Sequence, residues 1–150
     1  VALARDLVNE PANVMTPSAL ADAAKEVCEK QNIKCTILER EDCEALGMNA
    51  FLAVARGSKQ APKFIVMEYN GRVTDEEKIA LVGKGICFDA GGYNLKPSAS
   101  MKGMHGDMGG AAAVIAAMGA IAQAKLGINV TAVYPAVGGL IKIRVGRTGR

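Results

Sequence analysis

Short apolar runs alternate with helix-forming segments along most of the chain, and this alternation restricts its fold more than any other feature. Runs rich in β-branched residues occupy 33–38, 62–69, 79–83 and 128–134, and such runs are typical of strands. Segments with apolar residues at helical spacing lie between them. The alternation predicts an α/β domain with three layers, in which helices cover both faces of a mixed, mostly parallel sheet.

The helical segments differ in how clearly their ends are marked. Thr16 is predicted to cap the second of them, because Pro17 follows in the position where a helix tolerates proline best. Residues 50–55 are apolar and predict either a strand or a buried turn, and 84–106 predicts a long irregular loop rich in glycine. The predicted helices are 1–9, 17–31, 41–46 and 107–125.

Length and composition indicate one globular domain. The chain has 150 residues, of which 50% are hydrophobic and 22% are charged, so it is not of the disordered class. The longest apolar runs are shorter than the roughly 18 residues of a membrane span, and we expect no membrane partner. The first residues contain neither an initiating methionine nor a signal peptide. We therefore expect the chain to begin inside a longer protein.

The positive charge is concentrated at the end of the chain. The net charge is +3, yet residues 142–150 hold four basic residues and no acidic one. The other residues carry 14 basic and 15 acidic side chains, a net charge of −1. A basic surface for nucleic acid is therefore not a property of the domain, and we expect no nucleic-acid partner. A nucleic-acid-binding module stays an alternative that depends on this tail alone.

The four cysteines do not form a recognisable local motif. Cys28, Cys35, Cys43 and Cys87 include no C-x-x-C pair, and the chain has one histidine. This pattern argues against a zinc finger or a redox motif. Without a secretory signal, it predicts four reduced thiols in a cytoplasmic protein, with Cys87 a buried structural thiol.

Two lysines and two aspartates stand out in the glycine-rich part of the chain. Lys84 and Asp89 follow the strand predicted at 79–83, and Lys96 and Asp107 come later in the same stretch. Ligand sites of α/β sheets lie where strands end and loops begin, but neither a P-loop nor a G-x-G-x-x-G pattern is present. The residues alone leave open a carboxylate metal site, an anion-binding loop or a purely structural loop.

The amino-acid sequences of several segments resemble those of one family. The segments are Gly-Lys-Gly at 83–85, Phe-Asp-Ala-Gly-Gly at 88–92, Leu-Lys at 95–96, Asp-Met-Gly-Gly-Ala-Ala at 107–112 and Arg-Asp-Leu-Val-Asn-Glu-Pro-Ala-Asn at 5–13. They resemble the catalytic domain of the leucyl aminopeptidases, also called cytosol aminopeptidases or M17 peptidases. The resemblance extends from about Leu3 to Ala136. The paired Asp-x-Gly-Gly and Asp-Met-Gly-Gly motifs are its most specific part.

The resemblance implies a role for each of the four charged residues. Lys84 matches a metal-ligating lysine, Asp89 an aspartate that bridges two metals, and Asp107 a further ligand on the lysine's side. Lys96 matches the catalytic lysine that polarises the substrate carbonyl. The implied activity is two-metal hydrolysis that releases N-terminal residues, leucine-type, from peptides with a free N-terminus. The implied cofactors are two divalent ions, zinc or manganese, with magnesium also compatible.

The chain also departs from the family pattern. Ala90 stands where the family usually has serine, which we expect to matter little. The segment 138–150 lacks the Asn-Thr-Asp-Ala-Glu-Gly-Arg signature that supplies the family's remaining carboxylate ligands. We therefore expect 1–150 to be a partial catalytic domain: family-like over 1–137, with an atypical basic tail at 138–150. We also expect the family's N-terminal domain to be absent and the sheet to be incomplete on its C-terminal side.

These departures predict impaired peptide hydrolysis and keep a second function open. The alternative is a non-catalytic fragment or degenerate relative that only binds metal, peptide or partner subunits. The family resemblance implies a homo-oligomer, a hexamer. His105 is expected to be a surface residue or to lie behind the ligands. The three methionines of this region are expected to line a pocket or pack in the core: Met101, Met104 and Met108.

Overall fold

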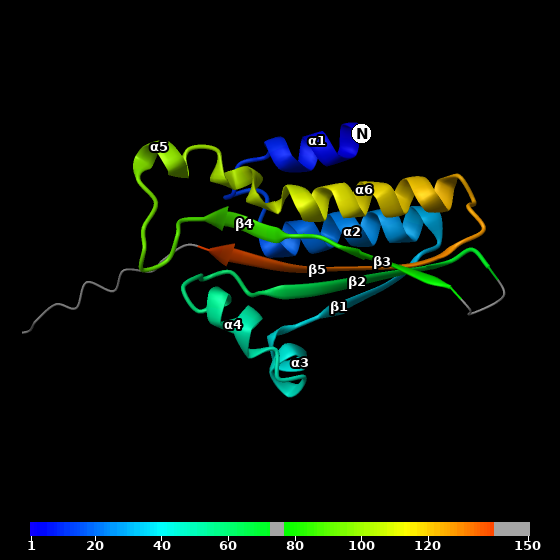
Figure 1. The fold of residues 1–150 in the computed structure, drawn as a ribbon, viewed down its shortest axis with the longest axis horizontal. Coiled ribbons are helices and arrows are strands. Elements are labelled where there is room, and N and C mark those ends of the chain that lie inside the picture. The colour runs from blue at the N-terminus through cyan, green and yellow to red at the C-terminus, as the bar shows by residue number, and fades with distance from the viewer. Residues whose placement is uncertain (73–76, 140–150) are drawn as a thin grey trace, which may run out of the picture.

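The computed structural model describes residues 1–72 and 77–139 (Figure 1). Within these ranges no helix is both long enough and apolar enough to cross a membrane. The strands are β1 (Lys34–Leu38), β2 (Lys63–Asn70), β3 (Lys78–Val82), β4 (Gly85–Asp89) and β5 (Asn129–Gly139). The helices are α1 (Ala2–Asn9), α2 (Pro17–Gln31), α3 (Arg40–Ala45), α4 (Asn49–Ala55), α5 (Ser98–Met101), the 3₁₀ helix η1 (Met104–Met108) and α6 (Gly109–Gln123).

The five strands form one mixed sheet, as the sequence predicts. Its order is β1-β2-β5-β3, and β4 also pairs with β5. The pairs β1/β2 and β2/β5 are antiparallel, whereas β3 and β4 both run parallel to β5. Parallel pairs therefore do not dominate the described sheet. Between β1 and β2 the chain has only two short helices, each about 10 Å long at 1.5 Å per residue. The chain then re-enters the sheet as β2, antiparallel to β1.

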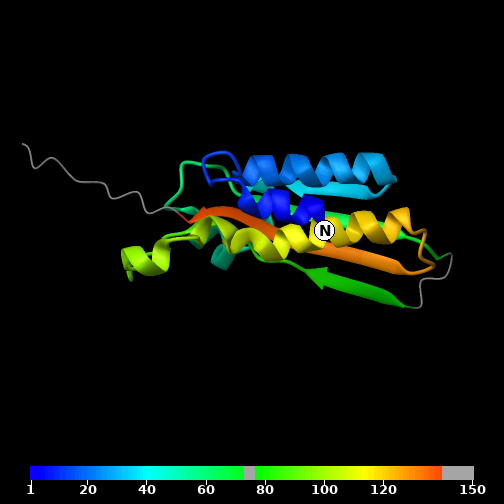
Figure 2. The same ribbon diagram turned by 90° about the horizontal axis from the view of Figure 1, so that it is seen from above.

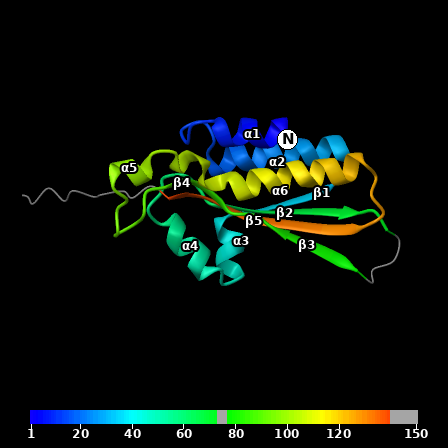
Figure 3. The same ribbon diagram turned by 45° about the horizontal axis from the view of Figure 1, so that its top comes forward.

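Helices cover both faces of the sheet, which confirms the predicted three layers. α1, α2 and α6 lie on one face, and α3 and α4 lie on the other (Figures 1 and 3). Viewed from above, α6 runs beside both α1 and α2 (Figure 2). The tail at 138–150 lies outside the described residues from position 140 onward.

The ends of α2 match the sequence signals. The Thr16 side chain accepts a hydrogen bond from the Ala19 backbone N–H at 3.2 Å, and Pro17 is the first helical residue. At the other end Asn32 adopts a left-handed conformation with φ of 52° and closes the helix. This cap turns the chain directly into β1.

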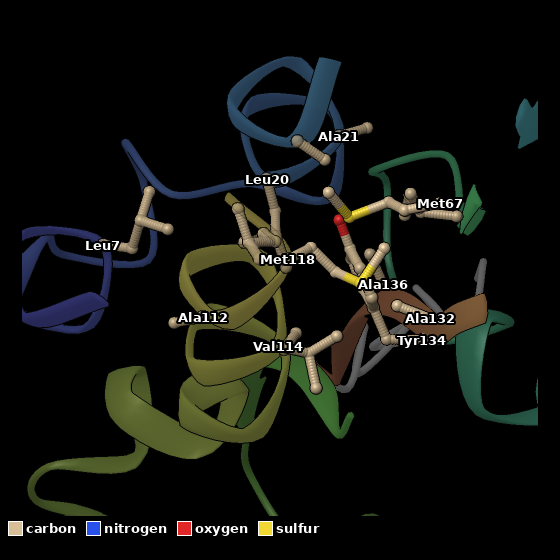
Figure 4. Close-up of a cluster of buried hydrophobic side chains, with 14 of the residues drawn as sticks. Leu7, Leu20, Ala21, Met67, Ala112, Val114, Met118, Ala132, Tyr134 and Ala136 are labelled. Atoms are coloured by element: carbon tan, nitrogen blue, oxygen red, sulfur yellow. The ribbon is translucent and has the colours of Figure 1, made fainter. Parts of the chain in front are cut away.

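The core lies between the sheet and the layer that contains α1, α2 and α6. Leu20 of α2, Met118 of α6 and Tyr134 of β5 converge on it and are fully buried (Figure 4). α6 presents the small residues Ala111 and Ala112 to this core, both fully buried. Small side chains allow the helix backbone to approach its neighbours closely.

For two segments the predicted type of secondary structure is wrong. Residues 49–55 form helix α4, and the buried Leu52 and Ala55 lie three positions apart on one side of it. A short apolar run does not distinguish helix from strand by periodicity alone. The supposed irregular loop at 84–106 contains strand β4 and the short helix α5. The glycines of this segment led to the prediction of a loop, because glycine is usually disfavoured in strands.

Tyr134 carries an unusual buried group that supports a stability prediction. Its hydroxyl is buried and has no hydrogen-bond partner in the described structure. An unpaired buried donor costs about 1–3 kcal/mol, so Tyr134→Phe is expected to raise the free energy of unfolding by about that amount. Urea unfolding followed by circular dichroism measures the change.

The matched control for this prediction is Tyr69→Phe. The Tyr69 hydroxyl donates to the Leu126 carbonyl at 3.0 Å, so its removal is expected to cost about 0.5–1.5 kcal/mol. The free energy of unfolding is therefore expected to rise in Tyr134→Phe and to fall in Tyr69→Phe. A Tyr134→Phe variant no more stable than the original chain would contradict the prediction.

Candidate functional site

Strand β4 places two of the four predicted site residues. It pairs in parallel with β5, beginning where Gly85 meets Ala136. Lys84 immediately precedes β4, and Asp89 is its last residue. The Lys84 carbonyl accepts a hydrogen bond from the Ala111 N–H at 2.9 Å. The backbone of Lys84 is therefore held between the sheet and the first turn of α6.

Glycines make this close approach possible. A β carbon on Gly110 would lie 2.7 Å from the Lys84 nitrogen. A β carbon on Gly83 would lie 2.9 Å from both the Ala111 Cα and the Gly110 carbonyl oxygen. Only glycine lets the two backbones pack this tightly. The packing brings Lys84 next to η1, which carries Asp107.

The structure joins the four predicted residues into two ion pairs. Lys84 Nζ lies 2.5 Å from Asp107 Oδ1, and Lys96 Nζ lies 3.2 Å from Asp89 Oδ2. Lys84 and Asp107 are 23 positions apart in sequence. The second Asp89 oxygen, Oδ1, accepts the Gly91 backbone N–H at 2.8 Å. Each aspartate is thus oriented by at least one positive or donating group.

The two pairs also act on one another electrostatically. The Gly91 hydrogen bond is the largest of the effects that lower the pKa of Asp89. The charges of Lys96 and Lys84 lower the same pKa further, and burial opposes them. Asp89 is therefore held as a carboxylate, and Lys84 connects the two pairs into one cluster.

A tight loop returns Lys96 to the end of β4. Gly91 has φ of +95°, and a β carbon there would lie 2.4 Å from the Asn94 carbonyl oxygen. The Lys96 N–H donates to the Ala90 carbonyl at 3.0 Å and closes the loop. Ala90 itself is buried. Gly91 was not among the predicted site residues, although its place in the Asp-Ala-Gly-Gly motif was a usable signal.

The cluster contains one buried oxygen without a hydrogen-bond partner, and this oxygen bears on whether the residues could bind a metal. Asp107 Oδ2 is buried without a hydrogen-bond partner in the described structure. A buried carboxylate oxygen without a donor is costly, and a divalent cation is a group that satisfies it. One amine and two carboxylates form a donor set compatible with zinc, manganese or magnesium. The residues present therefore fit a metal.

The donor set is nonetheless small. Within residues 1–72 and 77–139, no group of three His, Cys, Asp or Glu side chains could hold a metal ion. The cluster instead combines two aspartates with two lysines. Lysine is an uncommon ligand because its amine binds a metal only when neutral.

The neighbouring predicted residues take different positions. His105 is half-buried in η1 and lines an open pocket with Asn9 and Phe88. Met108 is fully buried and packs in the core, whereas Met101 and Met104 are half-buried. Cys87 is buried as predicted, and burial raises the pKa of its thiol to about 12.

The fold and the site together define an α/β protein with a lysine–carboxylate cluster where a sheet strand ends. The model of the "Cytosol aminopeptidase family, catalytic domain" matches residues 2–149. The chain belongs to the cytosol aminopeptidase family. The match includes most of the segment 138–150, and the division at residue 137 stays a prediction.

Relatives and solved structures agree with this assignment. A probable cytosol aminopeptidase of Alkaliphilus oremlandii is 52% identical over 134 residues, which are 89% of this chain and 27% of the relative. One from Syntrophotalea carbinolica is 49% identical over 149 residues, 99% of this chain and 30% of the relative. The crystal structure of the Coxiella burnetii cytosol aminopeptidase has a TM-score of 0.88 at 37% identity, covering 99% of this chain and 32% of that one.

A second similar structure was solved with a bound metal. The bottromycin maturation enzyme BotP in complex with Mn has a TM-score of 0.83 at 38% identity, covering 94% of this chain and 31% of that one. The chain thus spans about a third or less of the length of the relatives it matches.

Proposed function

We propose that this chain carries part of the active site of a metal-dependent aminopeptidase that releases N-terminal residues, leucine-type, from peptides. Lys84, Asp89 and Asp107 are proposed as metal ligands and Lys96 as the catalytic residue. One observation carries the proposal: the two Lys–Asp pairs lie together, with Asp107 Oδ2 buried and unpaired. The family assignment and the BotP complex with Mn support it.

The chain's own groups are suited to receive metal. Two bound divalent ions would activate a water molecule and polarise the scissile carbonyl. Asp89 is already oriented by Gly91 and held ionised. Lys84 must lose a proton before its amine can bind, so metal binding is expected to release protons. Manganese is the ion we favour, and zinc or magnesium would suit the same donors.

We propose that Lys96 acts on the substrate rather than on the metal. Its ammonium lies 3.2 Å from Asp89 Oδ2, and the Lys96 side chain is 29% exposed. A positive charge at this position would stabilise the negative charge that develops on the carbonyl oxygen. The proposed substrates are peptides with a free N-terminal amine. We further propose a cytoplasmic location, in keeping with the names of the relatives, and a homo-oligomer, which the family resemblance implies.

The small donor set supports a second candidate function. With two carboxylates and no third in the described cluster, the chain by itself is expected to hydrolyse peptides poorly. The alternative is therefore a non-catalytic segment that binds metal, peptide or partner subunits.

One pair of measurements on the 150-residue chain separates these functions. Mn²⁺ binding is measured by calorimetry, and leucine release is measured with leucine p-nitroanilide. We expect Mn²⁺ binding with slow, metal-dependent release. Lys96→Met is expected to remove the release while keeping the Mn²⁺ affinity within about twofold. Lys102→Met, at an exposed position of the same region, is the control and is expected to change neither.

Each outcome decides between the candidates. Slow release that Lys96→Met abolishes supports the aminopeptidase. Mn²⁺ binding without any release supports the non-catalytic alternative. A Lys96→Met variant with full release contradicts the role of Lys96, and failure to bind Mn²⁺ contradicts the metal site. Rapid release would show that the chain is not impaired.

A further inference from the structure

A groove far from the lysine–carboxylate cluster contains two cysteines. It lies between the end of α2 and strand β1 and has a volume of about 380 Å³. Cys28 and Cys35 both line it, together with Lys25 and Glu29. All four cysteines of the chain are free thiols. The proposed aminopeptidase uses neither Cys28 nor Cys35, so their proximity calls for a separate explanation.

The helix cap brings these two residues together. The backbone N–H groups of Asn32 and Ile33 both donate to the Cys28 carbonyl, the latter at 2.9 Å. Asn32 is left-handed, so the chain reverses within a few residues and enters β1. Cys35 is the second residue of β1 and is fixed opposite Met67 of β2. Cap and sheet register thus place Cys35 beside the last turns of α2.

Cys28 and Cys35 are close neighbours, because both line this one groove. Cys28 is 1% exposed, whereas Cys35 is partly open to the groove. Interaction between the two thiols is the main cause that lowers the pKa of Cys35 and raises that of Cys28. The charge of Lys25 favours the Cys35 thiolate, and burial and Glu29 oppose it.

A third polar group faces the same region of the core. The Tyr134 hydroxyl is fully buried and unpaired within the described structure. Its pKa is raised by burial and then by the nearby charges of Cys35 and Cys28. Tyr134 and Cys28 belong to one hydrophobic cluster, and Cys35 packs against it.

We propose that Cys28 and Cys35 form a redox-active dithiol that closes to a disulfide by exchange with a small disulfide such as oxidised glutathione. Cys35 attacks first because it is the more exposed of the two sulfur atoms. Its thiolate forms a mixed disulfide and releases one glutathione thiolate. The Cys28 sulfur then attacks Cys35, forms the Cys28–Cys35 bond and releases the second glutathione. The protein loses two electrons and two protons, and the glutathione disulfide gains them.

The other two cysteines provide an internal comparison. Cys43 and Cys87 are 0% and 2% exposed. Burial raises the pKa of both thiols, with nearby acidic side chains adding to the effect at Cys43. Neither lines the groove that holds Cys28 and Cys35. Thiol exchange is therefore expected to be selective for the Cys28–Cys35 pair.

The test uses the 150-residue chain in buffers of graded reduced and oxidised glutathione. Remaining thiols are blocked with iodoacetamide, and the peptides are identified by mass spectrometry. We expect a peptide in which Cys28 and Cys35 are joined, with loss of two hydrogen atoms, while Cys43 and Cys87 are still alkylated. Under reducing conditions Cys35 is expected to be alkylated at least about tenfold faster than Cys87.

Two variants check the order of the steps. Cys28→Ala is expected to trap Cys35 as a mixed disulfide with glutathione, and Cys43→Ala is expected to leave the cross-link unchanged. Circular dichroism confirms that each variant is folded. The proposal is overturned if the original chain stops at a Cys35–glutathione adduct, or if both thiols remain free in the most oxidising buffer. It is also overturned if Cys43 or Cys87 cross-links first.

Discussion

Replacing Gly85 with alanine is expected to lower the free energy of unfolding by about 4 kcal/mol or more, or to prevent folding. A β carbon at this position would lie 2.3 Å from the Pro135 carbonyl oxygen and 3.1 Å from its carbon. Both are backbone atoms of β5. They can move only if the pairing between β4 and β5 is disrupted, and that pairing also places Lys84 and Asp89. Urea unfolding followed by circular dichroism measures the effect.

The matched control is Gly127→Ala. A β carbon on Gly127 would meet no atom within 4 Å, so the free energy of unfolding is expected to change by no more than about 0.5 kcal/mol. A large loss at Gly85 with little change at Gly127 would show that the close approach of β4 and β5 causes the effect. Equal unfolding midpoints for Gly85→Ala and the original chain would contradict the described packing.

Asp107→Asn is expected to lower the Mn²⁺ affinity about 100-fold, which is the upper end of the losses seen when support of a metal site is removed. The same change is expected to leave the metal-free chain as stable as before, or more stable by about 1 kcal/mol. It replaces a buried, unpaired charged oxygen with a neutral amide. The lost ion pair contributes little, because the Lys84 side chain is 56% exposed.

Calorimetry and thermal unfolding with and without Mn²⁺ measure these two effects together. In the original chain a saturating metal concentration is expected to stabilise the fold by mass action, and in Asp107→Asn this shift should disappear. Asp22→Asn, at an exposed position of α2, is the control and should keep it. If Asp107 served only as a structural partner of Lys84, the variant would instead lose stability without metal and keep its Mn²⁺ affinity.

Much of the fold was predictable because the local signals agree with the tertiary structure. The cap at Thr16 and the proline after it mark the start of α2, and β2 coincides closely with the predicted strand at 62–69. Prediction failed where local composition is ambiguous. Residues 49–55 are helical because burial of Leu52 and Ala55 selects that conformation, and the run is too short for its periodicity to show it.

The residues of the site were predictable, but their arrangement was predictable only in part. The sequence motifs identified Lys84, Asp89, Lys96 and Asp107 as candidates, and the structure brings these residues into one cluster. The family resemblance put Asp107 on the side of Lys84, but the pairing of Lys96 with Asp89 was not predictable. The site geometry depends on the contact of Gly83, in the connection between β3 and β4, with Gly110 of α6, and on the left-handed Gly91. The contact joins residues far apart in sequence, so no local pattern encodes it.

The sequence by itself determined the alternation of strands and helices, the family and the residue types of the site, because these depend on local periodicity and on short motifs. Tertiary structure alone decided strand direction, the Lys96–Asp89 pair, the unpaired oxygen of Asp107 and the groove that Cys28 and Cys35 share. Each of these depends on which backbones can approach one another closely. That is a property of the packed chain, because the distances are set by residues that are distant in sequence.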